Sequence, residues 1–253
     1  MIHWHRLPEV VRIRVLLVLW IPTTIRILTI HMINYIIIMD EKIQFIKEWL
    51  GTGSINIFGL PFSGKDTVGV RLAEDLGGRF LSSGMILRSA AEVDMELKRD
   101  LAKGVLVPQE KFREIVLRYI GREDLQGYPL ILSSVGRWIG EEQDVVANCK
   151  QANHEIKAVV LLNIAETTVK ERWAVAQQTN DRGMREDDKI ENIIDTRIEE
   201  FLDKTMPVIE YYQGQNLLVP VAAHEDREKV YANVIDRLYE FARPYRVIIE
   251  GKN

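Results

Sequence analysis

From residue 54 onward, short apolar runs alternate with longer segments in which apolar positions recur every three or four residues. The short runs predict five strands, at residues 54–58, 79–82, 129–133, 157–162 and 216–221. The longer segments predict helices, at residues 65–76, 85–102, 108–120, 141–153, 166–177, 188–212 and 225–242. Strands and helices that alternate in this way predict an α/β fold with a parallel sheet. The run KAVVLL at 157–162 is nearly all apolar, which predicts an interior strand covered on both faces.

The first 38 residues differ from the rest of the chain. They contain apolar runs with few acidic groups, but arginines and Pro22 interrupt these runs, so neither a membrane-spanning helix nor a signal peptide is predicted. We expect residues 1–38 to be an amino-terminal hydrophobic arm outside the fold. A membrane-associating arm and an oligomer contact are the alternatives. Met39 opens an amphipathic segment that leads into the first strand, and a start of translation at Met39 is a further interpretation.

The composition limits the classes of function. The 253 residues are 47% hydrophobic and 28% charged, which excludes a disordered or fibrous chain. The formal net charge of −4 gives no general attraction to nucleic acid or to an anionic membrane, so we expect a small ligand held by a local cationic cluster. The single Cys149 excludes an internal disulfide and a cysteine-rich metal site. We expect its thiol to be buried and the protein to occupy a reducing, cytoplasmic location.

The strongest chemical signal is the sequence INIFGLPFSGKDT, which starts at residue 55 and runs from a predicted strand through a turn into a predicted helix. Its glycines allow backbone N–H groups to point at phosphate oxygens, and the helix that follows presents its positive dipole end to the same anion. Lys65 would neutralise the β and γ phosphates of a nucleotide. In the usual phosphate loop Ser or Thr follows this lysine directly, whereas here Asp66 intervenes before Thr67.

The displaced threonine makes this segment resemble the phosphate loop of the adenylate kinase family, G-x-P-x-x-G-K-x-T. The resemblance implies a P-loop NTPase-type, three-layer α/β/α fold with a five-stranded parallel sheet. It implies a kinase domain at 39–253 that contains acceptor-binding helices at 84–121 and a short lid at 178–187. The residues that it places against ATP are Gly59, Pro61, Ser63, Gly64, Lys65, Asp66, Thr67 and Arg172.

Four further segments match the family in the same order along the chain: SSGMILR at 82–88, KGVLVP at 103–108, LILSSVGRW at 130–138 and DRGMREDD at 181–188. The first three resemble the parts that bind the acceptor nucleotide, and the last resembles the lid. The implied acceptor-binding residues are Ser83, Arg88, Val107, Arg137 and Glu141. The implied lid residues are Arg182, Arg185, Asp187 and Asp188. The implied catalytic residues are Lys65, Arg137, Arg185 and Arg197.

The resemblance implies transfer of the γ-phosphoryl group of ATP to a nucleoside monophosphate, with ATP and Mg²⁺ as cofactors and AMP as the expected acceptor (ATP + AMP to 2 ADP). Arginines suit this reaction, because phosphoryl transfer needs charge neutralisation and positioning, and a guanidinium binds phosphate oxygens bidentately. The expected partners are small nucleotides, bound by a monomer, with no nucleic acid. A phosphate-loop kinase for another small acceptor stays open, as does a nucleotide-binding protein with little turnover.

Two positions depart from the family pattern. Met85 and Ser133 stand where the family has aspartates that hold water around Mg²⁺. Asp66 is the candidate replacement, because a carboxylate beside a polyphosphate is repulsive unless a cation lies between them. An ordinary acidic residue in the first turn of a helix is the alternative interpretation of Asp66.

The residue expected to contact the acceptor base differs as well. Glu141 stands where similar adenylate kinases carry glutamine. Glutamine suits adenine, whereas an ionised carboxylate only accepts hydrogen bonds and so suits the N1–H and amino donors of guanine. AMP stays the first expectation, with GMP or a broad specificity second. If the register shifts, Gln143 contacts the base, and a third interpretation is that Glu141 and Glu142 merely begin a helix.

Overall fold

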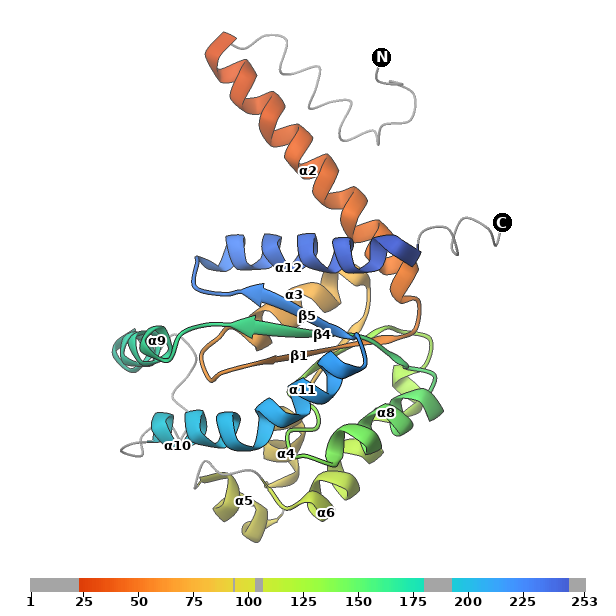
Figure 1. The fold of residues 1–253 in the computed structure, drawn as a ribbon, viewed down its shortest axis with the longest axis vertical. Helices are drawn as coiled ribbons and strands as arrows, with labels where there is room; N and C mark the ends of the chain where they lie inside the picture. Colours follow the sequence, from red (N-terminus) through yellow and green to blue (C-terminus); the bar gives the residue numbers. More distant parts are fainter. Residues whose placement is uncertain (1–22, 93, 103–106, 180–192, 246–253) are drawn as a thin grey trace.

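A five-stranded parallel sheet forms the centre of the protein, in a computed structural model that describes residues 23–92, 94–102, 107–179 and 193–245 (Figure 1). The strands are β1 (Ser54–Gly59), β2 (Arg79–Ser82), β3 (Leu130–Ser133), β4 (Ile156–Asn163) and β5 (Leu218–Ala222). Their order in the sheet is β2-β3-β1-β4-β5, and every neighbouring pair is parallel. The predicted α/β fold with five parallel strands is confirmed, because all five strands lie within two residues of their expected positions.

Helices cover both faces of this sheet. The longer ones are α2 (Thr23–Leu50), α3 (Lys65–Leu76), α4 (Ser83–Ala90), α5 (Met95–Ala102), α8 (Glu141–Gln151), α9 (Glu166–Thr179), α10 (Ile193–Glu200), α11 (Met206–Gly214) and α12 (Arg227–Ala242). Short segments complete them: α6 (Gln109–Phe112), α7 (Arg118–Ile120), the 3₁₀ turns Glu123–Leu125 and Arg243–Tyr245, and the π-helical turns Arg113–Leu117 and Phe201–Thr205. In Figure 1, α3 and α12 lie on one side of the sheet, and α8 and α11 lie on the other.

Two hydrophobic cores result from this layering. Alternate residues of one strand enter opposite cores, as the period of a β-strand requires. In β4, Val160 packs with the residues of α3 and α12, whereas Val159 and Leu161 pack with those of α8 and α11. The prediction that this strand is interior is therefore confirmed. Cys149 on α8 is fully buried, as expected for a small apolar side chain, and burial raises the pKa of its thiol to about 12.

The single helix predicted at 85–102 is wrong, because the structure has two helices there. The first, α4, ends at Ala90, and the second, α5, begins at Met95. The carboxylate of Asp94 accepts a hydrogen bond from the backbone N–H of Leu97 at 2.9 Å. An aspartate that bonds the N–H three residues later starts a new helix rather than continuing an old one, so this side chain explains the break.

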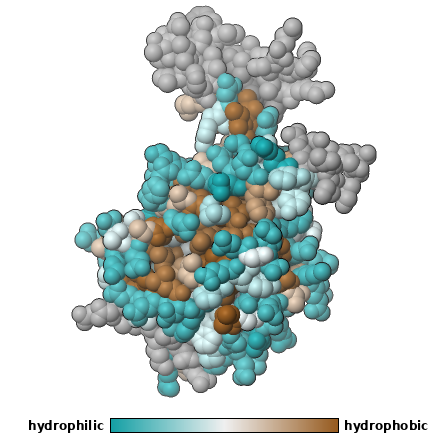
Figure 2. Space-filling view, in the orientation of Figure 1, coloured by the Kyte–Doolittle hydropathy of each residue, from teal (hydrophilic) through white to brown (hydrophobic). Residues whose placement is uncertain are grey.

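Helix α2 runs without interruption across the expected boundary at residue 38. Its carboxyl-terminal part packs on α12 and α3, and the fully buried side chains begin at Ile46. Its preceding part projects from the domain and exposes apolar side chains, among them Met32, Tyr35 and Ile38 (Figures 1 and 2). Within the described ranges no helix is long and apolar enough to cross a membrane. The separation of residues 1–38 from the folded domain at this boundary stays a prediction.

The two parts of α2 should differ in their contribution to stability. We expect Leu50→Ala to lower the free energy of unfolding by about 2–5 kcal/mol, since it leaves a cavity beneath a side chain with 0% exposure. Met32→Ala, on the projecting part where the side chain is 65% exposed, should leave it unchanged. Urea unfolding followed by circular dichroism measures both. A large loss for Met32→Ala would show that the projecting part stabilises the folded domain.

Candidate active site

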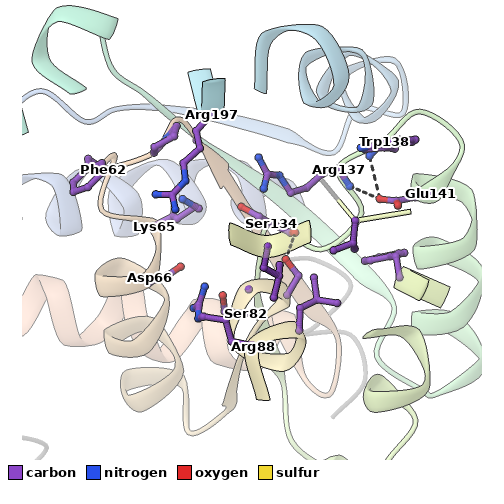
Figure 3. A pocket seen from close by; sticks show the side chains of 18 of the residues that line it. Phe62, Lys65, Asp66, Ser82, Arg88, Ser134, Arg137, Trp138, Glu141 and Arg197 are labelled. Atoms are coloured by element: carbon purple, nitrogen blue, oxygen red, sulfur yellow. Dashed lines mark hydrogen bonds between the residues drawn. The ribbon is translucent and has the colours of Figure 1, made fainter. Parts of the chain in front are cut away.

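A cavity of about 360 Å³ opens at the carboxyl edge of the sheet (Figure 3). The segments that line it include the loop between β1 and α3, helix α4, the loop after β3, and α10. The carboxyl ends of parallel strands meet at one edge, so residues far apart in the sequence converge there, and ligands of α/β proteins usually bind at this edge. The cavity has the size of a small-molecule site.

The loop between β1 and α3 is bent into a compact turn. Gly64 has a left-handed backbone with φ 91°, which favours glycine. A Cβ added at Gly59 would lie 2.6 Å from the hydroxyl oxygen of Ser63, so this position admits no side chain. Ser63 is buried, and its hydroxyl has no hydrogen-bond partner among the described residues. Since Gly64 also offers no side chain to cap α3, the first N–H groups of that helix stay available to an anion.

Four cations and two carboxylates line the cavity among the described residues. The cations are Lys65, Arg88, Arg137 and Arg197, and the carboxylates are Asp66 and Glu141. In Figure 3 the side chains of Lys65, Arg137 and Arg197 point toward one space from three different elements. The expected local cationic cluster is therefore present, although the whole chain carries a formal net charge of −4.

The loop that carries Arg137 is tied to the neighbouring strand. The buried side chain of Asn56, in the middle of β1, donates to the carbonyl of Val135 at 2.7 Å and accepts from its N–H at 3.3 Å. Gly136 has φ 74°, and a Cβ there would lie 2.8 Å from a methyl carbon of Val145. These contacts fix the path of the chain between β3 and Arg137.

The carboxylate of Glu141 holds the same turn from the other side. One of its oxygens accepts hydrogen bonds from the N–H groups of Arg137, at 2.7 Å, and Trp138, at 3.0 Å. Burial raises the pKa of Glu141, and these two hydrogen bonds act in the opposite direction because they favour the anion. The interpretation that Glu141 begins a helix is thus partly realised, since it is the first residue of α8, while its side chain also lines the cavity.

The guanidinium of Arg137 lies in an unfavourable electrostatic position. Desolvation by burial lowers its pKa to about 10; the nearby Glu200 opposes this and the nearby cation of Arg197 adds to it. The guanidinium group itself forms no hydrogen bond or ion pair with another described side chain. Arg137 is partly exposed to the cavity and still carries its charge at neutral pH, so an anion in the cavity would stabilise this cation.

One side of the cavity is mainly apolar. Its walls are Leu87, Leu101, Val107, Phe112 and Trp138. Ser83 donates its hydroxyl hydrogen to the carbonyl of Ser134 at 2.7 Å, so it connects α4 to the loop after β3. Gln143, the alternative contact for a base, is exposed on α8 and does not line the cavity. Of these two residues only Glu141 lines the cavity, which favours the sequence register in which Glu141 is the candidate contact.

The carboxylate of Asp66 faces the end of β3. Ser133, the last residue of that strand, donates its hydroxyl hydrogen to Asp66 at 2.6 Å. Within the described ranges no group of three or more histidine, cysteine or carboxylate side chains could hold a metal ion. One carboxylate with neighbouring hydroxyls fits Mg²⁺, which keeps several waters and takes further ligands from substrate phosphates.

Arg172 and the lid residues lie apart from this group. Arg172, on α9, donates to the backbone carbonyls of Phe62 at 3.3 Å, Ala223 at 2.9 Å and Glu225 at 3.1 Å, and so joins the phosphate loop to the segment after β5. It does not line the cavity, and its contact with a donor adenine stays a prediction. The predicted lid residues Arg182, Arg185, Asp187 and Asp188 lie outside the described residues.

Two residues of the site were not expected from the sequence. Asn56 is a polar residue inside an otherwise apolar strand, and that interruption was a signal that it has a specific partner. Trp138 follows Arg137 directly and forms part of the apolar wall, next to the ammonium group of Lys204, which lies 4.7 Å from the centre of its ring.

Comparison with known proteins places the chain among kinases. A family model described as adenylate kinase matches residues 57–217. The adenylate kinase of Brevibacillus brevis is 26% identical over 210 residues, which cover 72% of this chain and 97% of that protein. The adenylate kinase of Synechococcus sp. (strain CC9311) is 31% identical over 176 residues, covering 68% and 91%. A gluconokinase from Sinorhizobium meliloti has a similar fold, with a TM-score of 0.54, 20% identity and coverage of 78% and 97%.

Removal of the Arg137 charge should stabilise the protein. A base whose pKa is lower in the folded state costs stability at every pH below the folded pKa, and this cost begins to fall only as the pH rises above about 10, toward the ordinary pKa of arginine. At neutral pH we expect Arg137→Met to raise the free energy of unfolding by about 1–3 kcal/mol. Arg118→Met, at an exposed arginine of α7, is the control and should have no effect. A loss of stability in Arg137→Met, measured by urea unfolding, would contradict this account.

Proposed function

Because the chain belongs to the adenylate kinase family, we propose that this ATP-dependent kinase transfers the γ-phosphoryl group of ATP to a nucleoside monophosphate, with AMP as the first acceptor. One observation carries the proposal: the phosphate loop and the guanidinium groups of Arg88 and Arg137 line a single cavity. A second anion site beside a triphosphate site has a use only if the acceptor already carries a phosphate. The similarity to a gluconokinase concerns the fold alone.

On the donor side, the loop from Gly59 to Lys65 binds the phosphates of ATP. The backbone N–H groups and the positive end of α3 contact the phosphate oxygens, and the Lys65 ammonium neutralises the β and γ phosphates. Thr67, in the first turn of α3, lines the same cavity. Arg172 supports this loop by its hydrogen bond to the carbonyl of Phe62.

On the acceptor side, Arg88 and Arg137 bind the phosphate of the monophosphate. The base lies between the apolar side chains that include Leu87 and Val107, with Glu141 at its edge. Asn56 and Glu141 keep the Arg137 turn fixed, so the acceptor oxygen is held in line with the phosphoryl group. The acceptor phosphate is already an anion, and hence no general base is required of the protein.

Charge neutralisation during transfer is the role of Lys65, Arg137 and Arg197. Negative charge that spreads over the transferring group is stabilised by cations already in place, which need no reorganisation. By resemblance Arg185 joins them from the lid. Mg²⁺, when bound with ATP, supplies further charge neutralisation, and Asp66 is the side chain that would hold its water ligands.

GMP is the second candidate acceptor, and Glu141 favours it. A carboxylate accepts hydrogen bonds, and guanine offers two donors where adenine offers one donor and one acceptor. One oxygen of Glu141 already accepts two backbone N–H groups. Only its second oxygen is left for a base, so a two-oxygen fork onto guanine is not available in this arrangement. AMP therefore stays first.

Loss of either central cation should abolish transfer without unfolding the protein. We expect Lys65→Ala and Arg137→Ala each to reduce formation of ADP from ATP and AMP by at least about a hundredfold. The measurement is a coupled assay with ATP against each monophosphate, with circular dichroism as the test of folding. Lys150→Ala, at an exposed lysine of α8, is the matched control and should keep wild-type activity. Binding of ATP by the wild type without turnover of any monophosphate would support a nucleotide-binding protein instead.

Exchange of the base contact should change the acceptor preference. Glu141→Gln keeps an oxygen for the N–H groups of Arg137 and Trp138 and adds a donor for adenine. We expect the ratio of kcat/KM for AMP to that for GMP to rise by about tenfold or more. Gln143→Glu, which introduces the same carboxylate at the exposed neighbouring position, should leave the ratio unchanged. If Glu141→Gln lowers stability while the ratio stays constant, Glu141 only supports the turn.

A further inference from the structure

The end of β3 and the first turn of α3 carry a carboxylate and a hydroxyl in contact. Ser133 has 1% exposure, and its hydroxyl donates to Asp66 at 2.6 Å. Asp66 is half-buried and lines the cavity between Lys65 and Thr67. A hydroxyl has a single hydrogen to donate, so this bond commits it to the Asp66 carboxylate. Because the acceptor is ionised, the bond is charge-assisted and holds the carboxylate in one orientation.

Ser133 is fixed more rigidly than a loop residue. It pairs in register with Ile57 of β1 and with Ser82 of β2, and so it sits on the central part of the carboxyl edge. By the resemblance of residues 130–138 to the family, this is the position of an aspartate that holds water around Mg²⁺. A serine cannot replace that carboxylate, because its hydroxyl has no charge and a shorter reach.

We propose that Ser133 is a positioning residue, which holds the Asp66 carboxylate so that it takes over, from α3, the role that the family aspartate has on β3. In this exchange of a strand acid for a helix acid, relative to the family pattern that the chain resembles, a hydroxyl stands on the strand and orients the carboxylate. This inference rests on the proposed function only in that the cavity binds a nucleotide with its divalent cation. It extends the prediction for Asp66 by naming what orients it.

If Asp66 replaces the strand acid, the side chains at positions 66 and 133 should depend on each other electrostatically. An acidic residue that merely begins a helix would show no such dependence. A carboxylate at both positions would place two anions at hydrogen-bond distance, which is repulsive unless one is protonated or a cation lies between them. A carboxylate at either position alone is compatible with the site. The two positions should therefore be coupled, and exchange of both side chains should restore what each single change removes.

The test measures metal binding rather than turnover. Mn²⁺, a paramagnetic probe for Mg²⁺ sites, is titrated into the full chain with a non-hydrolysable ATP analogue, and free Mn²⁺ is followed by electron paramagnetic resonance. We expect Asp66→Ser to weaken Mn²⁺ binding to the nucleotide complex by about tenfold or more. We expect Ser133→Ala to weaken it by a smaller factor, while affinity for the analogue without metal stays unchanged. Ser89→Ala, at an exposed serine of α4, should match the wild type.

The double variant Asp66→Ser, Ser133→Asp keeps the composition of the site and exchanges its two side chains. We expect it to recover most of the Mn²⁺ affinity that Asp66→Ser loses. Equal Mn²⁺ affinity in the wild type and Asp66→Ser overturns the inference. So does a double variant that binds no better than Asp66→Ser, and so does a wild type without nucleotide-dependent Mn²⁺ binding.

Failure of this inference and failure of the proposed function give different results. If Mn²⁺ binding follows the pattern expected for the exchange but no monophosphate accepts a phosphoryl group, the inference stands and the proposed acceptor class is wrong. If ADP forms from ATP and AMP while Mn²⁺ affinity is the same in Asp66→Ser and the wild type, the proposed function stands and the exchange is wrong.

Discussion

The parallel pairing of β1 with β3 is the constraint on which the site depends. Their register sets Ile57 beside Ser133, so both strands end at the same edge of the sheet. There β1 continues into the phosphate loop and β3 continues into the Arg137 turn. Asn56 strengthens this pairing beyond the strand, because its amide bonds both backbone groups of Val135. A shift of one residue in this register would move both loops relative to each other and turn each side chain to the opposite face of the sheet.

The same arrangement opposes stability. Cations converge on the cavity, and the pKa of Arg137, lowered to about 10, shows that burial beside Arg197 outweighs the attraction of Glu200 and Glu141. The apolar cores on both faces of the sheet supply the stability that offsets this strain, and they do so without contributing a group to the chemistry. A cavity in which cations converge is thus unfavourable until an anion binds, which is a common property of binding sites that are organised in advance.

Departures from the family sequence acquire a physical meaning only through their neighbours. Ser133 seemed to be a lost aspartate, yet its hydroxyl is the partner of a carboxylate that arrives from α3. Glu141 seemed to select the nucleobase of the acceptor, yet one of its oxygens supports the turn that carries Arg137. In both cases the side chain holds a neighbouring group in position, whether or not it also contacts a ligand. Single positions therefore have to be interpreted in pairs.

The sequence by itself determined the strands, most helices and the phosphate loop, because periodicity, glycines and a lysine at fixed spacing act over short distances along the chain. The break between α4 and α5 escaped prediction, since the side chain of Asp94 outweighs a continuous apolar pattern over that stretch. Only the tertiary structure decided that Asp66 meets Ser133, that Asn56 holds the Arg137 loop, and that Glu141 rather than Gln143 faces the cavity. These contacts join residues whose distance in space depends on sheet order and register, and no local pattern along the chain encodes either of them.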